Sequence, residues 1–104
     1  MIQNELIYKA LGEIVKEFRN IMDYSQDDLA KRCNIGRASI ANIESGKFNV
    51  DFHIFICLSN ELGFNVSDVI ARVRKFQLYK ELEVVNISSL ADVYKKHSSD
   101  KEPK

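Results

Sequence analysis

Residues 25–47, SQDDLAKRCNIGRASIANIESGK, are the stretch that decides the fold of this 104-residue chain. Their pattern predicts two short helices, 26–33 and 37–45, separated by the turn Asn34-Ile35-Gly36. Ser25 is of the N-cap type and is followed three residues later by an acidic capping-box partner. Two helices joined by so short a turn cross at a steep angle.

Small and apolar residues occupy the positions where two crossing helices must touch. Ala30 lets the backbones approach, and Asn34 tolerates the positive φ that the turn requires. We expect Gly46 to end the second helix as a left-handed C′ residue. The side chains predicted to point inward are Leu29, Cys33, Ile35, Ile40 and Ile43.

Apolar spacing predicts three further helices around this pair. A stripe at steps of three and four predicts a helix over 6–22. Asp51 is expected to cap a helix over 52–62, and Ser67 to cap a fifth. The fourth helix is so apolar that part of it is a candidate interface. Its predicted core stripe is Phe52, Phe55, Leu58 and Leu62. The remaining apolar residues, Ile54, Ile56 and Cys57, cannot all be buried on the same face.

After Tyr79 the pattern is less regular. Residues 82–87 have the composition of a strand, 88–96 that of a short amphipathic helix, and 97–104 are polar. The apolar side chains of this extension either pack back on the domain or contact a partner chain. A basic cluster on the fifth helix could reach flanking DNA, although a solvated face is favoured; it consists of Arg72, Arg74, Lys75 and Lys80.

Composition limits the classes of protein to which the chain can belong. Fifteen basic residues balance fifteen acidic ones, so attraction to any polyanion through bulk charge is not expected. No apolar run approaches the roughly 20 residues of a membrane span, and residues 1–11 lack a signal-peptide core. Two cysteines are too few for a disulfide scaffold, which favours a reducing, cytoplasmic setting.

The sequence contains no pattern typical of catalysis. It has no Gly-rich phosphate loop and no nucleophile motif. His53 and Cys57 have the spacing of half a metal site, but a zinc site needs three or four ligands, and a small buried cysteine beside an ordinary histidine is favoured. We therefore expect no enzyme, no cofactor and no metal.

The central stretch resembles the phage-repressor and Cro-like, or XRE-type, helix-turn-helix domains. The resemblance covers residues 11–70, and its most specific elements are Ser-Gln-x-x-Leu-Ala at 25–30 and Ile-Glu-x-Gly-Lys at 43–47. It implies an all-α, compact five-helix, lambda-repressor-like DNA-binding domain over 1–70, with a C-terminal extension over 71–104. The third helix would be the recognition helix. The chain departs from the family pattern at Asp23, Asn34, Gly36 and Val50.

Helix phase separates the buried side of this third helix from the side that could meet DNA. With Ile40 and Ile43 inward, the opposite side is available to base edges, and the N-terminal end usually enters the major groove. Asn42 suits adenine, and Arg37 suits guanine or phosphate. The alternative is a solvated helix face that is small and polar by chance. The predicted base contacts are Arg37, Ala38, Ala41, Asn42 and Ser45.

Backbone contacts are expected on both sides of the recognition helix. Gln26 begins the second helix, where free amides favour an anion. The resemblance implies that Ser25 also meets the DNA backbone, although it could serve only as a helix cap. It further implies a partly buried ion pair between Arg19 and Glu44. The predicted phosphate contacts are Ser25, Gln26, Ser39, Lys47 and Asn49.

The charge balance bears on the assembly. Residues 9–47 carry seven basic and six acidic side chains, so one copy should bind DNA weakly. Two-fold dimers contact two half-sites and combine their contacts, which favours a homodimer on a palindromic operator. The leading interpretation is a transcriptional regulator that binds double-stranded DNA. The alternatives are an antitoxin that grips a protein partner through its extension, and an interaction module that has lost DNA binding.

Overall fold

The structure is a computed structural model that describes residues 4–47 and 49–84, with side chains to residue 79. This part of the chain forms five helices and no strand. The prediction of an all-α, five-helix domain is therefore confirmed. The helices are α1 (Asn4–Ile21), α2 (Gln26–Arg32), α3 (Arg37–Glu44), α4 (Phe52–Leu62) and α5 (Val66–Val84).

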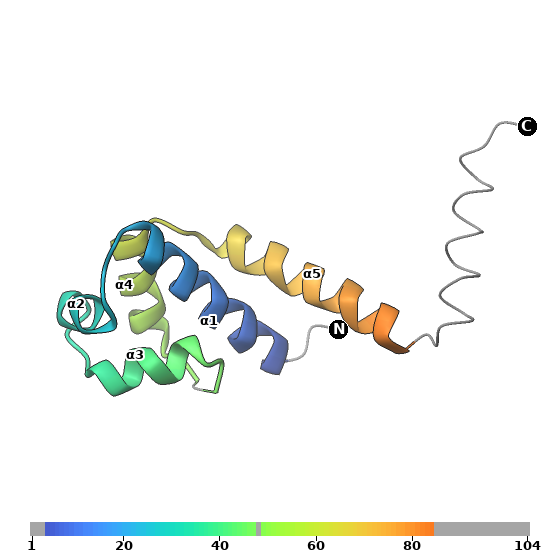
Figure 1. Cartoon of the computed structure of the whole chain (residues 1–104), viewed down its shortest axis with the longest axis horizontal. Helices are drawn as coiled ribbons and strands as arrows, with labels where there is room; N and C mark the ends of the chain where they lie inside the picture. Colours follow the sequence, from blue (N-terminus) through green and yellow to red (C-terminus); the bar gives the residue numbers. More distant parts are fainter. Residues whose placement is uncertain (1–3, 48, 85–104) are drawn as a thin grey trace, which may run out of the picture.

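The two long helices, α1 and α5, run antiparallel and pack against each other (Figure 1). α3 packs on another side of α1, and α2 and α4 lie at the same end of the molecule as the start of α3 (Figure 1). α1 is thus the central helix, and it supports α3 directly. This arrangement leaves the side of α3 that faces away from α1 at the surface.

One apolar core joins all five helices. The ring of Phe64, in the α4–α5 connection, meets Phe18 and Phe55 edge to face, with ring centroids 5.9 and 5.7 Å apart. Pairs of this geometry add about 0.5–1.5 kcal/mol each beyond simple burial. Among the described residues the buried apolar side chains are Ala10, Leu11, Ile14, Val15, Leu29, Ala30, Ile40, Ile43, Leu58, Leu62, Phe64, Val69 and Val73.

The turns have the backbone angles that their residue types predict. Asn34 has a φ of 55° and Gly46 a φ of 77°, as expected of the turn before α3 and of the residue that follows its C-cap. Asp23, where the resembled family pattern has glycine, also adopts a positive φ of 61°. Aspartate tolerates this region of backbone angles, so this departure from the pattern leaves the α1–α2 turn intact.

The predicted core stripe of α4 is wrong at one position. Phe52 is 78% exposed, whereas Ile54 is partly buried against the core. At about 100° per residue, Phe52 lies about 120° around the helix from Leu58, but Ile54 lies only about 40° from it. The apolar surplus of α4 is therefore at Phe52 and at Ile56, which is 50% exposed.

The start of α5 also differs from the prediction. Asn65, not Ser67, caps the helix, because its Oδ1 accepts from the Asp68 amide at 3.0 Å while Asp68 Oδ2 accepts from the Asn65 amide at 2.8 Å. α5 then continues to Val84, so the predicted strand is wrong over residues 82–84, which are helical. The rest of that strand, the helix predicted over 88–96 and the polar end lie outside the described residues.

The basic cluster predicted on α5 is not a uniformly solvated face. Arg72 donates to Glu13 Oε1 at 2.9 Å and to both carboxylate oxygens of Glu17 at 2.6 and 2.9 Å. These bonds tie α5 to α1. They lower the pKa of Glu17, chiefly through the hydrogen bond that Arg72 donates.

The helices were also considered as possible membrane spans, by their length and hydropathy. No single helix within residues 4–47 and 49–84 is both long and apolar enough to span a membrane; α4 and residues 66–79 reach that composition only together, as a pair bent by 101°.

Candidate nucleic-acid interface

The N-terminus of α2 is closed by a complete capping box. Ser25 Oγ accepts from the Asp28 amide at 2.9 Å, and Asp28 Oδ2 accepts from the Ser25 amide at 2.9 Å. These bonds lower the pKa of Asp28 and hold it ionised at the helix N-terminus. Ser25 is exposed, and its own hydroxyl proton is left to donate to a group outside the protein.

The turn between the two helices uses backbone bonds rather than side chains. The Ile35 amide donates to the Ala30 carbonyl at 3.0 Å, and the Asn34 amide donates to Lys31 at 3.3 Å. Gly36 is the N-cap of α3 and provides no side-chain cap. Gly36, Arg37 and Ala38 are exposed at this end of α3, the position where a helix favours an anion.

α3 divides into a held side and a free side. Ile40 and Ile43 are 0% and 1% exposed and anchor the helix in the core. Arg37, Ala38 and Asn42 are exposed, and Ala41 is half-buried between the two sides. The free side therefore presents one cation, one amide and two methyl groups, which together could form hydrogen bonds and apolar contacts with base edges.

Two serines among the predicted DNA contacts, Ser45 and Ser39, are less free to bind DNA than Arg37 and Asn42. Ser45 is exposed, but its Oγ already donates to the Asn42 carbonyl at 2.7 Å. As a base contact it would act as an acceptor, or would have to rotate. Ser39 is half-buried on the flank of α3, nearer to the core than Asn42.

Glu44 joins three helices at the end of α3. Arg19 of α1 donates to both carboxylate oxygens, through Nε to Oε2 at 2.6 Å and through NH2 to Oε1 at 3.1 Å. The two side chains are only 11% and 5% exposed, and the pair raises the pKa of Arg19. Gln26 of α2 donates to Glu44 Oε1 at 3.0 Å. Sequence reasoning paired Glu44 with Arg19 by resemblance and missed the bond to Gln26, for which the sequence offers no spacing signal.

The loop after α3 carries the remaining predicted contacts. Lys47 and Asn49 are both exposed, and residue 48 between them lies outside the described part of the chain. Gly46 lies against α1, where an added Cβ would stand 3.0 Å from the Lys9 Cα. The start of the loop is thus held next to α1 while Lys47 points into solvent.

Ion pairing reduces the basic charge available to DNA. Within the described residues, Arg19 pairs with Glu44, Lys31 with Asp27, and Arg32 with Glu61. Arg32 also lies over the Tyr24 ring, 4.2 Å from its centroid. The same residues provide no ion pair for Arg37 or Lys47, which flank the free side of α3.

Comparison with known proteins identifies this pair of helices. A family model described as a helix-turn-helix domain matches residues 12–75. The chain belongs to this helix-turn-helix family. As the sequence resemblance implied, it is of the XRE type, a family of DNA-binding transcriptional regulators. The match includes the whole helix-turn-helix unit, the Arg19 and Glu44 pair and the loop that carries Lys47.

Two solved structures share the helix-turn-helix fold. The clp gene regulator ClgR from Corynebacterium glutamicum is 21% identical, with a TM-score of 0.65 over 84% of this chain and 88% of that one. A mutant of the restriction-modification controller protein C.Esp1396I is 21% identical, with a TM-score of 0.57 over 69% of this chain and 91% of that one. At such identities the likeness concerns the fold. The curated proteins contain no match to the chain.

Proposed function

We propose that the chain is a sequence-specific regulator of transcription that acts in the cytoplasm as a homodimer on a palindromic operator. The observation that supports this most is the division of α3: Ile40 and Ile43 are fully buried, while the opposite side carries exposed groups suited to base edges. A helix so held can enter a major groove without disturbing the core. No catalytic step and no cofactor belong to this proposal.

In this proposal the exposed side of α3 makes the specific contacts. Asn42 forms the two-bond pair with adenine, Arg37 contacts guanine or phosphate, and Ala38 and Ala41 approach thymine methyl groups. Ser45 contacts the same groove from the end of the helix. Arg19 and Glu44 do not touch DNA in this proposal; they position α3 through the bidentate pair.

The phosphate contacts come from both ends of the unit. Ser25 and Gln26 lie at the N-terminus of α2, where helix amides add to the attraction of an anion. Gln26 has a second N–H to donate, since only one is taken by Glu44. Lys47 and Asn49 hold the backbone beyond α3, and Ser39 contacts it from the flank.

The small basic charge of one copy supports a homodimer as the form that binds DNA. With most arginine and lysine side chains of α1 and α2 engaged in pairs, few phosphates are neutralised per subunit, and affinity must come from two linked half-sites. In this scheme residues 1–70 bind DNA, and residues 71–104 serve contacts with the partner copy or with another protein.

A second candidate is an antitoxin that binds its own operator and a protein partner. The observation that favours it is the exposure of Leu78 and Tyr79 near the end of α5, at 54% and 50%. Co-expression with the product of the adjacent gene would test it. A stable complex that Leu78→Glu disrupts would support the antitoxin, and independent migration of the two proteins would reject it.

Selection of bound sites from random DNA, followed by affinity measurements, tests the proposed regulator. The selected site should contain two inverted half-sites about 10 bp apart. Arg37→Ala and Asn42→Ala should each lower affinity for it by roughly 5- to 100-fold. Asn60→Ala, at an exposed asparagine of α4, is the matched control. Wild-type affinity in both α3 variants would remove the assignment of the contact face.

Lys47→Ala gives a different signature in the same assay. It should weaken binding to all duplexes about equally and reduce the slope of log affinity against log salt by about 1. A selective loss of operator binding would instead make Lys47 a base contact.

A further inference from the structure

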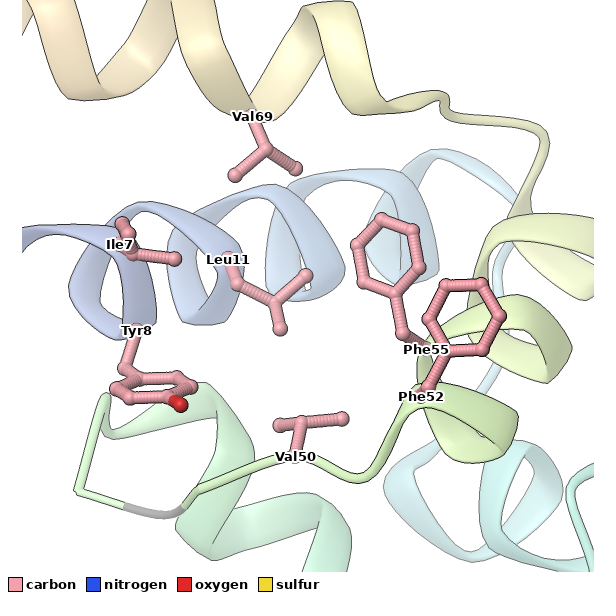
Figure 2. Close-up of a pocket in the computed structure, with 7 residues that line it drawn as sticks. All are labelled: Ile7, Tyr8, Leu11, Val50, Phe52, Phe55 and Val69. Carbon is pink, nitrogen blue, oxygen red and sulfur yellow. The ribbon is translucent and has the colours of Figure 1, made fainter. Parts of the chain in front are cut away.

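An open apolar pocket lies on the surface beside the end of α3. Its volume is about 300 Å³, and its walls come from four parts of the chain (Figure 2). Ile7, Tyr8 and Leu11 of α1 form one wall, and Val69 of α5 forms another (Figure 2). Val50 of the α3–α4 loop and Phe52 and Phe55 of α4 complete it.

The rim of the pocket carries an exposed aromatic ring. Phe52 lines the pocket, yet 78% of it remains exposed. Ile56, one turn further along α4, is 50% exposed, and Ile70, next to Val69 on α5, is 39% exposed. A large apolar side chain beside an apolar hollow is a surface that a partner normally covers.

We propose that this surface is the contact between two copies of the chain, in which Phe52 of each copy enters the pocket of the other. The inference rests on the homodimer of the proposed function and names its interface. A two-fold contact is isologous, so the same patch must supply both the projecting group and the hollow that receives it. Phe52 and the adjoining pocket meet that requirement within a single patch.

Charge favours a second copy as the occupant. Near a two-fold axis, each charged side chain meets its own copy and is repelled. The residues that line the pocket include no charged side chain, and the Tyr8 hydroxyl is their one polar side-chain group. The patch can therefore face itself without placing like charges together.

Phe52 supplies the largest single share of the exposed apolar area of this surface. An aromatic side chain buries about 150–250 Å², so Phe52 alone offers on the order of 150 Å² of the roughly 800 Å² per partner that a standard interface buries. The pocket walls and the exposed parts of Ile56 and Ile70 surround it with further apolar area. Buried aromatic anchors of this kind usually dominate the binding free energy.

The pocket adjoins the helix-turn-helix unit. Val50 lines it from the loop that follows α3, so a two-fold contact there would turn the C-terminal ends of the two recognition helices toward each other. DNA binding needs the two helices about 34–36 Å apart, in successive major grooves. Ile21, in contrast, is 76% exposed at the C-terminal end of α1, ten residues and almost three turns from Leu11, the nearest pocket residue of that helix.

Sedimentation equilibrium of the full chain and three variants tests the interface. Phe52→Glu introduces a charge at an exposed site and should raise the dimer dissociation constant by about 30-fold or more. Ile21→Glu introduces the same charge at a residue that is 76% exposed and should leave the constant within about threefold. Val50→Phe fills the pocket and should also weaken the dimer, by about tenfold or more. Circular dichroism and urea unfolding check that each variant is folded.

Three outcomes would overturn the interface: a monomeric wild-type chain, an unchanged dimer in Phe52→Glu, or dissociation by Ile21→Glu to the same extent as by Phe52→Glu. The outcomes for DNA binding are separate. A dimer that Phe52→Glu dissociates but that binds no DNA would keep this interface and remove the proposed regulator. If the chain binds the operator but Phe52→Glu leaves its dimer intact, the proposed regulator stands and this interface is removed.

Discussion

Gly12 lies so close to α3 that an added Cβ would stand 2.5 Å from the carbonyl oxygen of Ile43. The neighbouring atoms are backbone, so they cannot move aside without displacing α3. We expect Gly12→Ala to lower the free energy of unfolding by about 1–3 kcal/mol, as other overpacked sites do. Urea unfolding monitored by circular dichroism measures the loss.

Gly36→Ser is the control for this change. A Cβ at position 36 meets nothing within 4 Å, and its φ of −78° suits any residue. Serine would add the missing N-cap of α3, so stability should stay equal or rise by a few tenths of a kcal/mol. Equal losses in both variants would show that glycine itself, rather than the close approach, matters at Gly12.

The pair between Arg19 and Glu44 should be costly to break from one side only. Arg19→Met leaves Glu44 charged, largely buried and short of two donors, which should cost about 3 kcal/mol. Replacing both residues by methionine should cost less than the sum of the single changes. A double-mutant cycle by urea unfolding measures both quantities.

Asp27→Asn provides the exposed reference for that cycle. Its carboxylate is 3.4 Å from Lys31, and the two side chains are 58% and 78% exposed. Removing such a pair should cost under about 0.5 kcal/mol. If Arg19→Met cost as little, the buried pair would not hold α3 in place.

The contact between Arg72 and Glu17 should make stability depend on pH. Arg72 lowers the pKa of Glu17 below its ordinary 4.5, so the contribution is present above pH 4.5 and is lost as the pH falls through the lower, folded-state value. Because Glu17 is half-exposed, we expect Arg72→Met to cost only about 0.5–1 kcal/mol at pH 7. Urea unfolding at several pH values should show the difference shrinking below pH 4.5. Arg74→Met should show no such trend, and a constant difference for Arg72→Met would contradict the link to Glu17.

The Cys33 thiol should be inert in the folded protein. Burial, with the neighbouring Cys57 thiol, raises the pKa of Cys33 to about 12. Since the thiolate is the reactive form, alkylation by iodoacetamide at pH 8 should be about 100-fold or more slower than in the urea-unfolded chain. Peptide mapping by mass spectrometry separates this site from Cys57. Equal rates in the folded and unfolded chain would contradict the burial.

The helices and their turns were largely predictable because the signals are local. Ser25, Asn34 and Gly46 each act through their own backbone or a residue three positions away, and their roles were confirmed. The cap of α5 was missed although it is also local, because both Asn65 and Ser67 are good caps and only the reciprocal bonds to Asp68 decide between them.

Contacts between helices were harder to predict because sequence spacing does not reveal them. Arg72 meets Glu13 and Glu17 across 59 and 55 positions, and nothing in its neighbourhood distinguishes it from Arg74. Phe52 is a residue type usually found in cores. It is exposed because of the way α4 is rotated about its axis relative to α1 and α5. The candidate base and phosphate contacts stay predictions.

The two sides of α3 share almost no residues, since the groups that anchor it are Ile40, Ile43 and Glu44. Positions 37, 38 and 42 can therefore mutate freely without unfolding the chain. Under the proposed function, selection could retarget such a protein to new promoters by exchanging a few surface residues on an unchanged scaffold. A library randomised at those three positions without proline, which would break the helix at positions 38 and 42, should yield folded proteins and thus a ready source of altered specificities.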